Sequence, residues 1–113
     1  MVDPLLALRH RNDLVRLLRT WQDAHDYADR HPDEADRLMA FREKLSVLRF
    51  REAEKGLFYP SLREQGPLLE PGGVLADNLA AVKRVQVHLG MVKPGAPIPR
   101  VDDEPLRLAL GRT

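Results

Sequence analysis

The stretch DPLLALRHRNDLVRLLRTWQDAHDYADRHP, residues 3–32, decides the predicted fold. The residues of one helix face recur in it at steps of three and four: Leu6, His10, Leu14, Leu17, Trp21, Ala24 and Ala28. Asp3 before Pro4 is typical of a helix start, because aspartate caps free N–H groups and proline suits the first helical position. Pro32 disfavours helix in the residue before it. We therefore expect one amphipathic helix over residues 4–29.

A second helix is expected to begin at Pro32, with three carboxylates in its first turn that complement the positive end of the helix: Asp33, Glu34 and Asp36. Its apolar positions begin on one face and then shift to another: Ala35, Leu38, Phe41, Leu45 and Leu48, then Val47, Phe50, Ala53, Leu57 and Phe58. This shift predicts a long helix that contacts more than one neighbour.

The pattern is disturbed at Pro60, and two interpretations stay open there. Proline crowds the carbonyl four residues earlier, which belongs to Gly56, so a kinked helix is one interpretation. The favoured one is a break followed by a short helical turn over residues 61–65. Ser61 and Glu64 have the spacing of a capping box, and Gly66 suits a C-terminal cap.

The remainder of the chain indicates one shorter helix and an arm. A connection over residues 66–73 precedes a helix over 74–89, whose apolar stripe is Leu75, Leu79, Val82, Val85 and Leu89, with Gly90 as its cap. The proline-rich residues 93–105 predict an extended arm, with a final turn that carries Leu106, Ala109 and Leu110. No strand pattern is found.

The predicted fold class is thus all-α, with three main helices. The two long helices form an antiparallel helical hairpin, and the third helix is shorter. The domains are a helical bundle, residues 1–92, and a proline-rich C-terminal arm, residues 93–113. Two helices of about 25 residues (about 38 Å) and one of about 16 (about 24 Å) do not complete a four-helix bundle. Leaving the uncovered apolar stripe in water would cost several kcal/mol.

The expected remedy for this shortfall is association with a copy of the chain or with another protein. The interface residues predicted from the apolar stripe and the arm are Leu14, Leu17, Leu18, Trp21, Leu38, Phe41, Leu45, Leu48, Leu106 and Leu110, and the arm, with Leu108, would act as a docking strap. The alternative is that the arm folds back and supplies the cover itself, through Ile98, Val101 and Leu106.

Length and composition exclude several classes of protein. The chain has 113 residues, the size of one domain, with 18 basic and 17 acidic residues and a net charge of +1. This balance provides no global attraction to nucleic acid or membrane. The lack of cysteine excludes disulfide scaffolds, thiolate metal sites and cysteine nucleophiles. No apolar run reaches the roughly 18 residues of a membrane span. A cytoplasmic protein without membrane contact is expected.

The histidines and serines do not form a recognisable catalytic pattern. None of the histidines has a glutamate three residues before it, the pair that a di-iron bundle needs. His25 and Asp29 share a helix face and could both touch one ion, but two ligands are not a site. The weak metal candidates are His10, Glu54 and His88. Neither serine lies in a nucleophile motif. We expect no enzyme activity and no cofactor.

Basic residues give the alternative of nucleic-acid binding. One predicted helical ridge consists of Arg37, Lys44, Arg51 and Lys55, and a second cluster of Arg9, Arg11, Arg16 and Arg19. Such ridges can follow a phosphate backbone. The competing interpretation is a solvated face, or ion pairing with the acid-rich residues 22–36 of a neighbouring copy.

Two short stretches resemble known families. Phe50-Arg51-Glu52-Ala53-Glu54, with Leu57-Phe58-Tyr59-Pro60-Ser61-Leu62, resembles the second helix of hemerythrin-like domains, in which a His-x-x-x-Glu pair binds iron. Glu54 matches that glutamate, but Phe50 replaces the histidine, so the resemblance implies a helical bundle without its di-iron centre. Residues 63–66, Asn78 and residues 89–91 resemble the closing part of small terminase subunits of tailed phages, which implies a DNA-packaging role for the nucleic-acid alternative.

The sequence thus predicts a non-enzymatic helical assembly or adaptor module that acts through protein–protein association. The alternatives are a nucleic-acid-binding helical oligomer and a degenerate hemerythrin-like bundle with a residual metal site.

Overall fold

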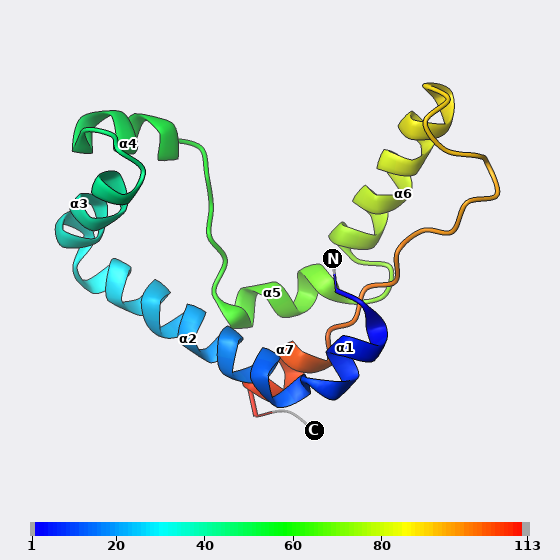
Figure 1. Cartoon of the computed structure of the whole chain (residues 1–113), viewed down its shortest axis with the longest axis horizontal. Coiled ribbons are helices and arrows are strands. Elements are labelled where there is room, and N and C mark those ends of the chain that lie inside the picture. The colour runs from blue at the N-terminus through cyan, green and yellow to red at the C-terminus, as the bar shows by residue number, and fades with distance from the viewer. Residues whose placement is uncertain (1, 112–113) are drawn as a thin grey trace.

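The computed structural model describes residues 2–111, which form helices joined by turns and irregular segments, with no strand among them (Figure 1). The helices are α1 (Pro4–Arg9), α2 (Arg11–Arg30), α3 (Pro32–Arg42), α4 (Val47–Glu54), α5 (Leu62–Leu69), α6 (Val74–His88) and α7 (Glu104–Ala109). The all-α prediction is therefore confirmed. No helix of this part of the chain has the length and apolar content needed to cross a bilayer.

The first expected helix is divided at His10. Asp3 caps α1 as predicted, since its Oδ1 accepts hydrogen bonds from the N–H groups of Leu5 (2.9 Å) and Leu6 (3.1 Å). His10 leaves helical geometry, with φ −112° and ψ 29°, although backbone hydrogen bonds still link it to both neighbouring turns. α2 then runs to Arg30, and Pro32 starts α3 as the sequence predicts.

The single long helix expected from residue 32 to residue 58 is wrong. α3 ends at Arg42, and Lys44 takes the left-handed conformation with φ 58°. The N–H of Leu45 donates to the carbonyl of Ala40 (2.9 Å), and that of Lys44 to the carbonyl of Phe41 (3.2 Å). These two bonds form a Schellman motif, which ends a helix and turns the chain. Ser46 then caps α4 through the N–H of Arg49 (3.2 Å).

At Pro60 the structure shows the favoured break, and the predicted capping box follows it. Ser61 Oγ accepts from the N–H of Glu64 (3.3 Å), and Glu64 Oε2 accepts from the N–H of Ser61 (2.7 Å). Gly66 is not the helix end that we expected, because α5 continues through it and through Pro67 to Leu69. α6 closely matches its predicted range, and Gly90 follows it with φ 72°.

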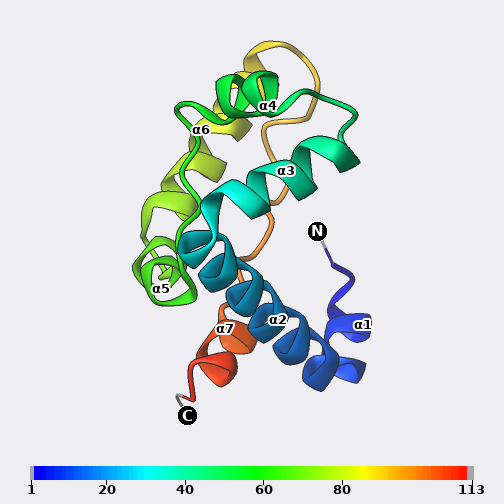
Figure 2. The ribbon, with the colours of Figure 1, turned by 90° about the vertical axis from the view of Figure 1, so that its left-hand side faces the viewer.

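The C-terminal helix α7 packs along α2, as both ribbon views show (Figures 1 and 2). Leu106 of α7 is 3% exposed, and Arg19 of α2 donates to the carbonyls of Leu108 (3.3 Å) and Ala109 (3.4 Å) at the end of α7. The segment 91–103 connects α6 to α7. The core of the described residues is small: Val15, Ala35, Ala40, Phe50, Leu62 and Leu106.

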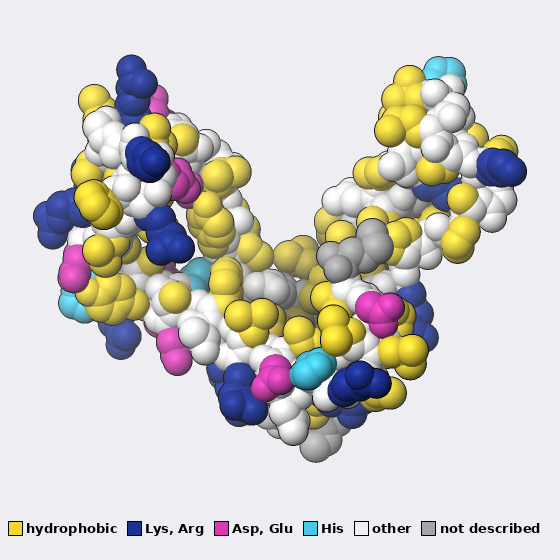
Figure 3. Space-filling model, viewed as in Figure 1, with side chains coloured by type: hydrophobic (Ala, Val, Ile, Leu, Met, Phe, Trp, Pro, Cys, Tyr) yellow, Lys and Arg dark blue, Asp and Glu magenta, His cyan; other side chains and the backbone are white. Residues whose placement is uncertain are grey.

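The molecule has an open shape. α1, α2, α5 and α7 form its base, while α3 with α4 and, opposite them, α6 form two arms (Figure 1). The space-filling view shows an opening between these arms (Figure 3). The radius of gyration is 17.5 Å, whereas a compact chain of this length has about 13 Å. The accessible surface is 9306 Å², against about 6,300 Å² for a folded monomer of this mass. The chain therefore leaves about 3,000 Å² more surface in water than a closed domain would.

Candidate functional site

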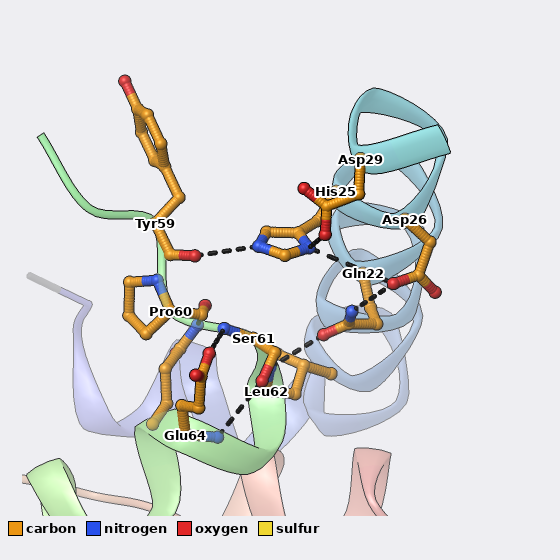
Figure 4. A network of polar contacts seen from close by, with 10 residues as sticks. Gln22, His25, Asp26, Asp29, Tyr59, Pro60, Ser61, Leu62 and Glu64 are labelled. Atoms are coloured by element: carbon orange, nitrogen blue, oxygen red, sulfur yellow. Dashed lines mark hydrogen bonds and ion pairs between the residues drawn. The ribbon is translucent and has the colours of Figure 1, made fainter. Parts of the chain in front are cut away.

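A polar network holds the base of the opening together where α2 meets the segment before α5 (Figure 4). His25 Nε2 lies 2.8 Å from the carbonyl oxygen of Tyr59, to which it donates a hydrogen bond. Gln22 Oε1 accepts from the N–H of Leu62 (2.7 Å), and Gln22 Nε2 donates to Asp26 Oδ1 (2.8 Å). These contacts fix the path of residues 59–62 against α2 and so set one side of the opening.

The predicted pair of His25 and Asp29 does come together in this network. The distance from His25 Nδ1 to Asp29 Oδ2 is 3.4 Å, and the buried Nδ1 makes no hydrogen bond within residues 2–111. The two groups form an ion pair when the ring is protonated. No third ligand joins them: among the described residues, no three His, Asp or Glu side chains lie where they could share a metal ion.

The weak metal candidates lie on three separate elements. His10 is at the start of α2, Glu54 at the end of α4 and His88 at the end of α6, and the last two are on opposite arms (Figure 1). His10 Nδ1 pairs with Asp13 (3.2 Å), and Glu54 Oε2 accepts from the Tyr59 hydroxyl (2.7 Å). That hydrogen bond, with burial and the charge of Glu54 adding to it, raises the pKa of Tyr59. The structure does not bring the three candidates together.

The predicted basic ridge is interrupted, because the turn at residues 43–46 separates α3 from α4. Arg51 instead bridges these helices through Asp36 (2.8 Å) and Asp33 (2.9 Å), and its hydrogen bond to Asp36 is the main reason that the pKa of Arg51 is raised. Most of the other candidate cations also have partners within the chain: Lys55 with Glu52, Arg11 with Glu104, Arg16 with Asp13, and Arg19 with the end of α7. Among residues 2–111, no acidic side chain forms an ion pair with Arg9, Arg37 or Lys44.

The predicted interface residues divide into three groups: buried, half-buried and exposed. Leu106 lies in the core between α7 and α2, so it serves the fold of the chain itself. Of the other two residues that the fold-back alternative named, Val101 is half-buried and Ile98 is exposed. Leu14, Leu18, Leu45 and Leu110 are half-buried. The side chains that do face solvent are Leu17, Trp21, Leu38, Phe41 and Leu48; Phe41 is 85% exposed and Leu48 is 73% exposed. Phe41 and Leu48 flank the corner between α3 and α4.

Two further apolar surfaces were missed at the sequence level. Leu57, Phe58 and Tyr59 are exposed in the segment between α4 and α5, and Phe58 is 72% exposed. On the opposite arm, α6 exposes Val74, Val82, Val85 and Leu89. The space-filling view shows hydrophobic side chains along the inner sides of both arms and across the floor between them (Figure 3). The apolar patterns of the sequence included Leu57, Phe58, Val82, Val85 and Leu89, but they indicated that these side chains would be buried.

A hollow of about 460 Å³ lies between α2, the start of α5 and the end of α7. Its polar lining residues already serve the local fold: Arg19 binds the end of α7, Gln22 binds Leu62, and Ser61 caps α5. We assign no reaction to it.

Comparison with known proteins gives no relative for the chain: no family model matches it, and no significant match is found among curated proteins or solved structures.

Proposed function

We propose that this chain is a non-enzymatic helical assembly or adaptor module that functions by binding another protein chain through its exposed apolar side chains. The observation that carries the proposal is the open shape, with its radius of gyration of 17.5 Å and its 9306 Å² of accessible surface. The excess of about 3,000 Å² is several times the roughly 800 Å² that one partner contributes to a standard interface.

The nature of the exposed side chains supports the same proposal. Single exposed leucines are ordinary, but contiguous apolar patches on a small monomer are typical of interaction surfaces. Here Phe41 and Leu48 are mostly exposed to water, whereas the largest fully buried side chain of the described residues is Phe50. Aromatic and aliphatic side chains of this kind are the usual anchors of protein interfaces.

The test is sedimentation equilibrium of the full chain and of a Phe41→Glu, Leu48→Glu variant, with far-UV circular dichroism as the check on folding. We expect the wild type to contain more than one chain per particle and the variant to dissociate at least about tenfold more readily, because each glutamate would have to enter an apolar contact. The matched control is Arg63→Glu on α5, which changes charge on an exposed polar position. A wild type that is monomeric and compact at every concentration would contradict the proposal.

A further inference from the structure

One face of α6 is apolar and exposed, and it packs against no other described part of the chain. Val74, Val82, Val85 and Leu89 are each more than half exposed, and at 100° per residue they fall within an arc of about 80°. The opposite face of α6 is occupied: Ala80, Lys83 and Val87 line a hollow shared with Pro94 and Ile98 of the connecting segment, and the exposed Arg84 lies at the edge of this hollow. The exposed stripe thus points away from the two parts of the described chain that cover α6, which are α5 and the connecting segment. Hydrophobic side chains lie on the inner side of this arm, which borders the opening (Figure 3).

The charges beside this stripe are self-complementary. Asp77 and Arg84 are seven residues apart, so they lie on the same edge of the stripe, and both are exposed. No ion pair within residues 2–111 involves either side chain. If two copies of α6 lie antiparallel with their midpoints near residue 81, Asp77 of each copy faces Arg84 of the other. The same register places Val74 beside the partner's Leu89.

We propose that a second copy of this chain occupies the opening, with its α6 paired antiparallel to α6 of the first copy, stripe against stripe. This inference rests on the proposed function and names its partner. A twofold contact of this kind uses the same surface on both copies, and it leaves the corner with Phe41 and Leu48 as a separate contact surface. Each α6 then enters the opening of the other copy, where the wall that carries Leu57, Phe58 and Tyr59 faces it. With a net charge of +1 per chain, no strong repulsion opposes the pairing.

The test uses charge reversal in the full chain: Asp77→Arg, Arg84→Asp and the double variant, compared by sedimentation velocity over a range of concentrations. Each single reversal creates two like-charge contacts per dimer, so we expect the dissociation constant to rise about tenfold or more. The double variant restores both pairs in the opposite sense and should return to within about threefold of the wild type. Arg63→Asp on α5 is the matched control and should leave the dissociation constant unchanged.

The possible outcomes separate this inference from the proposed function. Recovery in the double variant supports the α6 pair. If the dimer is equally stable in all the variants, the proposed α6 pairing is wrong. The two copies then associate through another surface, and the proposed function stands. If the chain is a monomer with an extended shape, the proposal that a second copy fills the opening is wrong. The proposed function then requires a different protein as the partner. A monomer that is compact overturns both proposals.

Discussion

The side-chain oxygen of Gln22 in α2 accepts a 2.7 Å hydrogen bond from the backbone N–H of Leu62, the first residue of α5. This contact joins two helices that are 40 residues apart in the sequence, and Leu62 itself is buried. A helix N-terminus carries N–H groups without partners inside the helix, so Gln22 satisfies one donor that the Ser61–Glu64 capping box leaves over. The contact therefore ties α5 directly to α2.

Replacement of Gln22 by alanine is expected to lower the free energy of unfolding by about 1–2 kcal/mol, because the Leu62 N–H loses its partner in a partly buried place. Gln22→Glu keeps an acceptor oxygen and should cost less. Urea unfolding at a fixed protein concentration measures both variants. Equal stability of Gln22→Ala and the wild type would show that the contact does not hold α5 to α2.

The backbone of Lys44 has a φ of 58°, which is unfavourable for residues with a side chain. Glycine at this position would avoid that conformational strain. We expect Lys44→Gly to raise the free energy of unfolding by about 0.5–1 kcal/mol. Lys44→Ala, which keeps the β-carbon, is the control and should give no gain. Thermal unfolding followed by circular dichroism distinguishes them, and a destabilised Lys44→Gly would mean that the α3–α4 turn is not left-handed in solution.

Leu106 tests whether α7 belongs to the folded body. Its side chain is 3% exposed, so Leu106→Ala should remove about 2–5 kcal/mol of stability. Leu17→Ala, at an exposed position of α2, should change stability by about 0.5 kcal/mol or less. If the two variants unfold at the same urea concentration, α7 does not pack on α2.

The capping box gives a dependence on pH. Hydrogen bonds from the backbone and side chain of Ser61 lower the pKa of Glu64 below its usual value of 4.5. Because the folded state holds the charged form, this contribution is present above the unfolded pKa and is lost as the pH falls through the folded one. The free energy of unfolding should therefore fall below about pH 4.5, and less steeply in Glu64→Gln, which keeps the cap acceptor. Identical pH profiles would contradict the assignment.

The interruption of the basic ridge has a measurable consequence. With Arg51, Lys55, Arg11 and Arg16 paired to acids, we expect no DNA binding tighter than about 10⁻⁶ M at physiological salt. Fluorescence anisotropy with a labelled duplex measures this. Tight binding that weakens steeply with salt, and that disappears in Arg37→Glu with Lys44→Glu, would favour the nucleic-acid alternative instead.

Local signals in the sequence predicted several helix starts correctly, but not those of α2 and α4. Asp3 with Pro4, Pro32, and the Ser61–Glu64 box all begin helices in the structure, because each acts on the N–H groups of its own first turn. The signal for the end of α6, a glycine at position 90, was equally local. Such features need no knowledge of the rest of the chain.

The turn at Lys44 could not be predicted in the same way. Its left-handed residue is not glycine, and the apolar pattern continues across it from Phe41 to Leu48, so the sequence resembles one helix. The Arg51 bridge to Asp33 and Asp36 exists only once that turn is made. For the same reason, no pattern could show that α6 would be covered on one face and left open on the other.

The most direct test of the central claim, that one chain alone leaves its apolar surface unburied, is small-angle X-ray scattering of the full chain across a range of concentrations. It reports particle mass and radius of gyration together. We predict a particle of at least twice the chain mass of 12.9 kDa, which on dilution gives a monomer that keeps a radius of gyration near 17.5 Å. A particle of 12.9 kDa at all concentrations, with a radius of gyration of about 13 Å, would contradict the account.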